Sequence, residues 1–354
     1  MVLQKSGKTI LVTAGTIALA LGVAAILMHW GNRTVESFDP QSSSRPIRLA
    51  VEFNSHAACF YIAESKGWFQ EEGIIIEGFD SYVTGVALAA ALVNGGIDAA
   101  YLCLIPAITA YTNGRAPLKI VAGTHKYGYS LAVDPVTIKS VRDLEHPQIR
   151  IGCAREGSPT DALLHKLIEM YHLDRTKVLD NVRRMSPPEQ LMALCAGQLD
   201  AALMSEQYPT MAEAQGFTVL VRAQDLWPNM QGSVLVVTDE LLKKHPEVVE
   251  KLVRVTDRAT HWLTDHPEDA ASIVASELTR AGAQAFPLEA AAIVKGQEVL
   301  PEVVFRSLTK SLACTTDLDP AAVQATIDYL VKLGNMPVRF QAEDVLDLRW
   351  IHNE

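Results

Sequence analysis

Apolar runs and amphipathic stretches alternate along most of this chain, and the alternation predicts strands and helices in turn. In the first part, the predicted strands are 48–53, 74–77, 98–102 and 118–122, and the predicted helices are 57–69, 84–93 and 105–111. A repeated succession of strand and helix is typical of a mainly parallel sheet with helices on both faces. The pattern therefore predicts an α/β fold.

A second cycle predicts strands at 149–153, 182–185, 200–204 and 218–221, with helices at 159–171, 187–196 and 208–215. One more strand, 233–238, precedes a region that is almost entirely helical, with helices at 247–266, 267–280, 288–300 and 320–333. We expect these last helices to pack back on the first sheet. The chain would then cross between two sheets near 131–135 and 227–233, and two crossing segments form a hinge.

A ten-residue phrase, Ala-Leu-Val-Asn-Gly-Gly-Ile-Asp-Ala-Ala at 91–100, is echoed 102 residues later by Ala-Leu-Cys-Ala-Gly-Gln-Leu-Asp-Ala-Ala at 193–202. Each copy is typical of a helix end, a glycine and a short apolar strand. A chance match in an alanine-rich chain is the alternative. The repeat favours two similarly built lobes, and ligands of open α/β sheets bind beyond the carboxyl ends of the strands. We therefore expect a ligand cleft between the lobes.

The N-terminus carries a long apolar segment. Residues 10–30 contain no charged side chain, and Lys5 and Lys8 precede them. Twenty-one residues of helix can cross a bilayer, and the lysines should stay in the cytoplasm. We expect an uncleaved signal and membrane anchor at 1–34 and a flexible linker at 35–46; removal of the segment after an internal alanine is the alternative. Either outcome places the folded part outside the cytoplasmic membrane.

Charge and cysteine content exclude several classes of function. The formal net charge is −10 and the chain has no basic stripe, which argues against nucleic-acid binding. The five cysteines form no C-x-x-C pair, and whether any of them pair with one another stays open. The sequence has no G-x-S-x-G, Walker or H-E-x-x-H motif and no dinucleotide fingerprint. We therefore expect no catalytic residue, no metal site and no cofactor.

Candidate ligand-binding residues lie near the ends of predicted strands. Ser158 and Pro159 open a predicted helix whose N-terminus suits an anionic or polar group, although an ordinary capped helix would have the same sequence. His56 could donate or accept a hydrogen bond, and Glu206 would suit a ligand with donors or positive charge. The full set is Asn54, His56, Thr84, Leu104, Thr124, Lys126, Ser158, Thr160, Glu206 and Gln231.

From residue 48 to the C-terminus, the chain resembles the exported solute-binding proteins of ABC importers, in the nitrate/sulfonate/taurine and thiamine-pyrimidine-precursor (NMT1/THI5-like) group. The resemblance rests on ordered motifs: His56-Ala57 with 60–74, the Ile-Asp-Ala-Ala run at 97–100, 157–161, 234–237 with 242–249, and 326–334. It implies the two-lobed type II periplasmic binding protein fold with a hinged cleft. Lobe 1 would then comprise 47–130 and 233–354, and lobe 2 would comprise 131–232.

The resemblance also implies a function. We expect a monomeric extracytoplasmic protein that captures a small-molecule ligand and delivers it to an ABC permease and its ATPase, tethered to the cytoplasmic membrane by its N-terminal segment. The ligand stays open among sulfonate, pyrimidine and aromatic-acid types. His56 and Ala57 favour the pyrimidine type, and among cations the sequence places only Lys126 and Arg155 near the cleft. The alternatives are an enzyme on the same fold, acting on a small aromatic or pyrimidine-type substrate, and a ligand-sensing domain.

Overall fold

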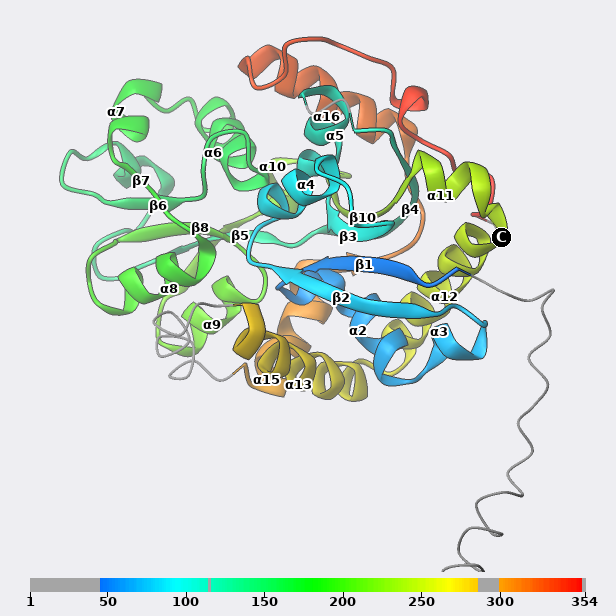
Figure 1. The fold of residues 1–354 in the computed structure, drawn as a ribbon. Helices are drawn as coiled ribbons and strands as arrows, with labels where there is room; N and C mark the ends of the chain where they lie inside the picture. The colour runs from blue at the N-terminus through cyan, green and yellow to red at the C-terminus, as the bar shows by residue number, and fades with distance from the viewer. Residues whose placement is uncertain (1–44, 114–115, 286–298, 352–354) are drawn as a thin grey trace, which may run out of the picture. The chain divides into compact units, whose positions relative to one another are not determined.

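The computed structural model describes residues 45–113, 116–285 and 299–351, and within these ranges the strands form two sheets flanked by helices (Figure 1). The first sheet has the order β11 (Leu312–Cys314), β4 (Leu118–Tyr127), β10 (Gln231–Thr238), β3 (Ala99–Cys103), β1 (Ile47–Glu52) and β2 (Ile76–Tyr82). The second has the order β7 (Val182–Arg184), β6 (Ile151–Cys153), β8 (Ala201–Ser205), β5 (Tyr129–Val133) and β9 (Thr218–Arg222). The predicted α/β class is confirmed.

Both sheets are mixed, whereas the sequence pattern predicted mainly parallel pairing. In the first sheet, β1 pairs parallel with β2 and β3, but β10 pairs antiparallel with both β3 and β4. In the second sheet, β6 pairs parallel with β7 and β8, but β5 pairs antiparallel with β8 and β9. The reversed strands β10 and β5 both follow a crossing from the other sheet. A strand that enters this way has no crossover helix on its own sheet to keep it parallel.

The first crossing between the sheets differs from the expected one. β4 extends to Tyr127 and β5 begins at Tyr129, so the chain changes sheet at Gly128 and not near 131–135, which lies partly inside β5. Gly128 has a φ of +88°, and a Cβ there would lie 2.7 Å from His56 Nε2, so both conformation and space require glycine. The return crossing lies between α10 (Ala223–Leu226) and β10, within the expected 227–233 region.

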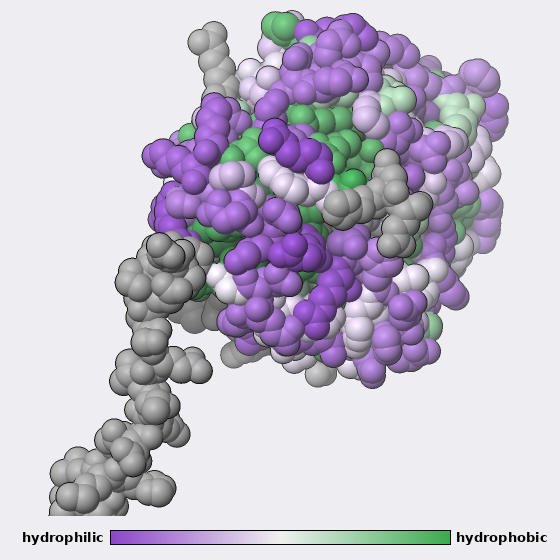
Figure 2. All heavy atoms as spheres, turned by 90° about the vertical axis from the view of Figure 1, so that its right-hand side faces the viewer, coloured by the Kyte–Doolittle hydropathy of each residue, from purple (hydrophilic) through white to green (hydrophobic). Residues whose placement is uncertain are grey.

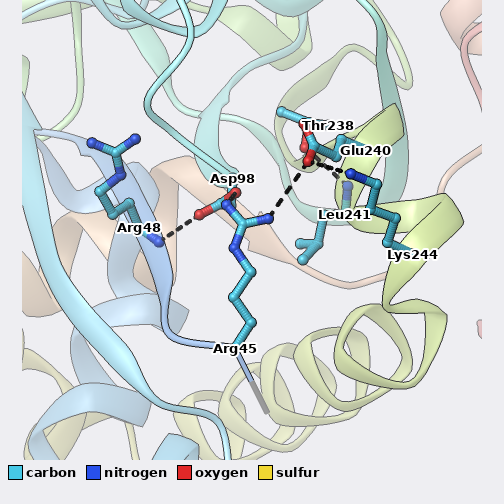
Figure 3. Close-up of polar contacts among 7 residues, drawn as sticks. All are labelled: Arg45, Arg48, Asp98, Thr238, Glu240, Leu241 and Lys244. Carbon is cyan, nitrogen blue, oxygen red and sulfur yellow. Dashed lines mark hydrogen bonds and ion pairs between the residues drawn. The ribbon is translucent and has the colours of Figure 1, made fainter. Parts of the chain in front are cut away.

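The repeated phrase marks two copies of one structural unit. Helix α4 (Gly85–Val93) and helix α8 (Pro187–Cys195) begin and end 102 residues apart, and β3 and β8 do the same. The two aspartates of the phrase make equivalent contacts. Asp98 accepts hydrogen bonds from the Arg48 backbone N–H and the Arg45 guanidinium, both at 2.9 Å (Figure 3), and Asp200 accepts three from Arg150 at 2.8–2.9 Å.

The same contacts hold the beginning of the described chain on the first sheet. Arg45 also lies 3.9 Å from Glu240 Oε1, and Lys244 binds that carboxylate at 2.9 Å (Figure 3). Glu240 belongs to α11 (Asp239–Lys244), whose first turn is capped by the Thr238 hydroxyl, which accepts from the Leu241 N–H. Strand β1 is therefore tied at its start to both β3 and α11.

The remaining helices cover the two sheets. They are η2 (Ser55–Ala57), α2 (Ala58–Ser65), α3 (Trp68–Glu71), α5 (Leu104–Asn113), η3 (Val141–Glu145), α6 (Pro159–Met170), α7 (Arg175–Asp180), α9 (Tyr208–Ala214), α12 (Pro246–Asp265), α13 (Pro267–Ala285), α15 (Pro301–Arg306), η4 (Ser307–Ser311), α16 (Pro320–Leu333) and η5 (Ala342–Asp344). Helices α12 and α13 pack against α2 on the first sheet, as expected. The predicted helix at 288–300 lies almost wholly outside the described residues.

Helix α12 shows how the C-terminal helices bury one face. Val249 and Leu252 are fully buried, whereas the side chains of Glu250 and Arg254 are half exposed. The face of the molecule that carries α11 and α12 is mainly hydrophilic, with hydrophobic atoms visible in the hollows between polar side chains (Figure 2).

Within the described ranges, no helix is both long and apolar enough to span a bilayer. The expected anchor at 1–34 and most of the expected linker at 35–46 lie outside those ranges.

Candidate functional site

A cavity of about 270 Å³ lies where the carboxyl ends of strands from both sheets meet. Its first-sheet side is lined by Glu52, Asn54, Val83, Thr84, Gly85, Val86, Cys103 and Pro106. Its second-sheet side is lined by Tyr129, Ala154, Arg155, Ser158, Pro159, Thr160, Arg184, Met185, Ser186, Pro187 and Ser205. This is the position in which open α/β folds bind their ligands.

Half of the lining follows the internal repeat. Pairs of residues 102 positions apart face the same cavity from opposite sheets: Glu52 and Ala154, Val83 and Met185, Thr84 and Ser186, Gly85 and Pro187, Cys103 and Ser205. Equivalent loops of the two units therefore meet across the cavity, and their side chains differ mainly in charge and size.

The helices α4, α6 and α8 begin at the cavity wall with a hydroxyl-bearing residue. The hydroxyls of Thr84 and Ser158 cap α4 and α6 by accepting from the N–H groups of Ala87 and Asp161 at 3.3 and 3.2 Å. Ser186 caps α8 in a reciprocal arrangement with Glu189. The N-terminal end of a helix carries a partial positive charge and attracts anions. Two of the three ends belong to the second-sheet side.

Two arginines lie on that same side, and one of them is unpaired among the described residues. Arg184 pairs with the buried Asp161 at 2.7 Å and donates to the Ala154 carbonyl at 2.6 Å. Arg155 is exposed at the cavity, and its guanidinium has no ion pair or hydrogen bond within the described part of the chain. Arg155 is thus available to a ligand anion.

The first-sheet side carries a buried carboxyl, Glu52, at the end of β1. Its oxygens accept hydrogen bonds from the Cys103 N–H at 3.1 Å, the Cys103 thiol at 2.9 Å and the Asn54 amide at 3.2 Å. Burial raises the pKa of Glu52, and these hydrogen bonds offset part of the rise. Gly85 makes room for the carboxyl, because a Cβ at that position would lie 1.7 Å from Glu52 Oε1.

Four of the ten predicted residues line the cavity: Asn54, Thr84, Ser158 and Thr160. That they touch a ligand stays a prediction. Ser158 and Thr160 also contact each other, with their hydroxyl oxygens 3.2 Å apart.

The other six predicted residues do not line this cavity. Leu104 is fully buried in the core, and Glu206 is fully buried with its carboxylate accepting from the Thr210 hydroxyl at 2.7 Å. Gln231 donates to the carbonyls of His125 and Ser233 at 2.9 and 2.8 Å.

His56, Thr124 and Lys126 also lie apart from the cavity, and Thr124 and Lys126 share one reason. The sequence pattern ended the fourth strand at 122, but β4 continues to Tyr127, so Thr124 and Lys126 belong to the sheet rather than to a loop. Lys126 lines a separate wide hollow beside α12. His56 lies behind Cys103, and its Nε2 donates to the Gly128 carbonyl at 2.8 Å.

Several lining residues escaped the sequence analysis. Glu52 and Cys103 end apolar strands, and their side chains resembled core positions there. Ser186 and Ser205 could have been found from the repeat, because they lie 102 residues after Thr84 and Cys103. The repeat could not have indicated Arg184 or Tyr129, because no cavity-lining residue of the first unit lies 102 positions before either of them.

Comparison with known proteins gives a family match. A family model described as the NMT1-like family matches residues 41–278. A binding protein from Brucella abortus (strain 2308) is 26% identical over 229 residues, which cover 61% of this chain and 66% of that protein. The chain thus spans slightly less than two thirds of the length of this relative.

Two solved structures share the fold. The alkanesulfonate-binding protein SsuA from Xanthomonas axonopodis pv. citri, bound to MOPS, has a TM-score of 0.69 and 19% identity, covering 86% of this chain and 100% of its own. The periplasmic nitrate-binding protein NrtA from Synechocystis PCC 6803 has a TM-score of 0.69 and 14% identity, covering 87% of each chain. The predicted periplasmic binding protein fold is confirmed.

Proposed function

Because the chain belongs to the NMT1-like family, we propose that it is the solute-binding component of an ABC importer. It captures a small organic solute between its two sheets and delivers the solute to a permease that an ATPase drives. The observation that carries this proposal is the cavity, which equivalent loops of both repeat units line from opposite sides. A solute that contacts both sides stabilises a closed form relative to an open one.

The lining favours a solute with an anionic group and an apolar body. Arg155 and the N-termini of α6 and α8 offer positive charge on one side. Val83, Val86, Pro106 and other apolar side chains surround the remaining space. An organic sulfonate or aromatic carboxylate fits this arrangement better than a neutral pyrimidine or a bare inorganic anion.

We also propose that the protein works outside the cytoplasmic membrane as a monomer, held there by the apolar segment 10–30. Two observations support this location. The chain shares its fold with periplasmic binding proteins, and two lysines precede the apolar segment.

Calorimetric titration with a panel of alkanesulfonates, aromatic acids, pyrimidines and nitrate tests the proposal. We expect saturable 1:1 binding of at least one organic anion. The variant Arg155→Ala lacks one ionic contact to the solute, so it should bind the organic anion about ten- to a hundredfold more weakly than wild type. Lys126→Ala, which removes a cation outside the cavity, is the matched control and should bind like wild type. Failure of the whole panel, or equal losses in both variants, would contradict the proposal.

An enzyme on the same fold is the alternative. Cys103 would be its nucleophile, but burial and the neighbouring Glu52 raise the pKa of this thiol well above its ordinary value, which disfavours the thiolate. Recovery of the bound solute unchanged after long incubation separates a binding protein from an enzyme.

A further inference from the structure

Three potential metal ligands of different chemistry meet at the wall of the cavity and directly behind it. One oxygen of Glu52, Cys103 Sγ and a ring nitrogen of His56 all lie within 4.8 Å of one another, and all three residues are buried. They come from the ends of β1 and β3 and from η2. Glu52 and Cys103 line the cavity, so the group borders on space that a ligand or water can reach.

The histidine tautomer suits coordination. A carbonyl oxygen only accepts, so the 2.8 Å contact between His56 Nε2 and the Gly128 oxygen places the proton on Nε2. The lone pair is then on Nδ1, which lies 3.6 Å from Cys103 Sγ. A metal-binding histidine commonly donates its other N–H to a backbone carbonyl in this way.

The other two side chains are also oriented by outer partners. The Tyr129 hydroxyl donates to Cys103 Sγ at 2.8 Å, and Ser233 Oγ donates to the same sulfur at 3.6 Å. Asn54 and the Cys103 N–H donate to Glu52. Each potential ligand is therefore held by at least one group that would remain in place around an ion.

The distance between sulfur and nitrogen agrees with a tetrahedral centre. With a metal–sulfur bond of about 2.3 Å and a metal–nitrogen bond of about 2.0 Å, the sulfur and nitrogen would lie about 3.5 Å apart. The observed separation of Nδ1 and Sγ is 3.6 Å. Glu52 Oε2 lies 2.9 Å from Sγ because the thiol proton is between them, and replacing this proton by an ion requires an opening of only about 0.6 Å.

We propose that Glu52, His56 and Cys103 bind one divalent cation of the Zn²⁺ class, with a fourth position that faces the cavity. Imidazole and thiolate ligands select Zn²⁺ and similar ions over Mg²⁺ and Ca²⁺. Binding breaks the S–H bond of Cys103, forms a sulfur–metal bond and releases the proton to solvent. The proposed site departs from the expectation of no metal drawn from the sequence, in which His56 and Cys103 lie 47 positions apart.

Titration of the untagged full-length chain, in mild detergent, with Co²⁺ and then with Zn²⁺ alone tests the site. We expect one Co²⁺ per chain, a thiolate-to-cobalt charge-transfer absorption, and displacement of Co²⁺ by Zn²⁺. Cys103→Ser should abolish that absorption, and Cys103→Ser and His56→Gln should each weaken Zn²⁺ binding at least about tenfold. Cys195→Ser, which removes an exposed thiol, is the control and should behave like wild type.

Wild-type protein without the charge-transfer absorption would overturn the site, whether or not the variants fold. Retention of stoichiometric binding in both Cys103→Ser and His56→Gln would do the same. Solute binding, measured separately with and without Zn²⁺, is a different readout, so failure of the metal site leaves the importer function standing.

Discussion

At the scale of single residues, some positions are fixed by a neighbouring side chain and not by the local backbone conformation. Gly85 begins helix α4 with an ordinary helical backbone, so its lack of a side chain serves the neighbouring Glu52 and not the turn. Glu206, in contrast to Glu52, is a buried carboxyl that does not line the cavity.

Gly85→Ala should destabilise the protein, although alanine is the better helix former. The new Cβ would lie 1.7 Å from Glu52 Oε1 and would force the buried carboxyl away from Cys103, a cost of about 1–3 kcal/mol. Urea denaturation measures the effect. As the control, Ala90→Gly on the exposed face of the same helix gives the difference in helix propensity between alanine and glycine, about 1 kcal/mol. A stabilised Gly85→Ala variant would contradict the close contact.

Glu206→Gln should reduce the pH dependence of stability. Burial raises the pKa of Glu206, and the Thr210 hydroxyl and the charge of Arg222 offset part of the rise. A raised folded-state pKa favours the protonated carboxyl, so wild-type stability falls as pH rises from the ordinary carboxyl pKa through the raised value.

Melting temperatures of wild type and Glu206→Gln between pH 5 and pH 8 measure this. Wild type should lose stability relative to the variant as pH rises, while Glu250→Gln, a change at a half-exposed carboxylate, should follow wild type. If the difference in melting temperature between wild type and Glu206→Gln were the same at pH 5 and pH 8, the raised pKa of Glu206 would be contradicted.

At the scale of elements, the duplicated unit explains both the fold and the site. Each copy contributes a strand end, a capped helix and a second strand end to the cavity, and each uses its repeated aspartate to tie two strands together. The shared offset of 102 residues extends to Arg48, which lies in β1, and Arg150, which directly precedes β6.

Asp200→Asn should weaken the second copy of this tie. The pKa of Asp200 is lowered because Arg150 donates hydrogen bonds to it, but the arginine side chain is 41% exposed, so solvent screens the pair. We expect a loss of about 1 kcal/mol in the free energy of unfolding, with a similar loss in Asp98→Asn. If Asp200→Asn were as stable as wild type, the repeated aspartate would have no structural role.

The sequence predicted regular elements better than the segments between sheets. The helix at 320–333 and the repeat units follow from periodicity and caps that act within a few residues. Strand β5 was missed because a single glycine separates it from β4, and only pairing with β8 and β9 distinguishes the two strands. Thr124 and Lys126 were assigned to a loop for the same reason, and Glu52 was placed in the first strand without a role in the site.

At the scale of the whole molecule, we propose that the N-terminal segment holds the binding domain at the membrane. If residues 10–30 stay attached, residues 35–46 form a linker that spans about 20 Å on average, which keeps the domain near a membrane-embedded permease and raises its effective concentration there. N-terminal sequencing of the native protein should find Met1 or Val2 in the membrane fraction. A soluble protein that starts after Ala20 or Ala25 would end the tether proposal and leave the binding proposal intact.

The central claim is that a solute held between the two sheets draws them together. X-ray scattering of the domain from residue 45 onward, with and without a saturating organic anion that binds in calorimetry, measures this most directly. The account predicts a smaller radius of gyration for the complex than for the free domain. At a solute concentration at which Arg155→Ala no longer binds the solute, the radius of gyration of this variant should stay unchanged. A radius of gyration unchanged by a solute that demonstrably occupies the cavity would contradict the claim.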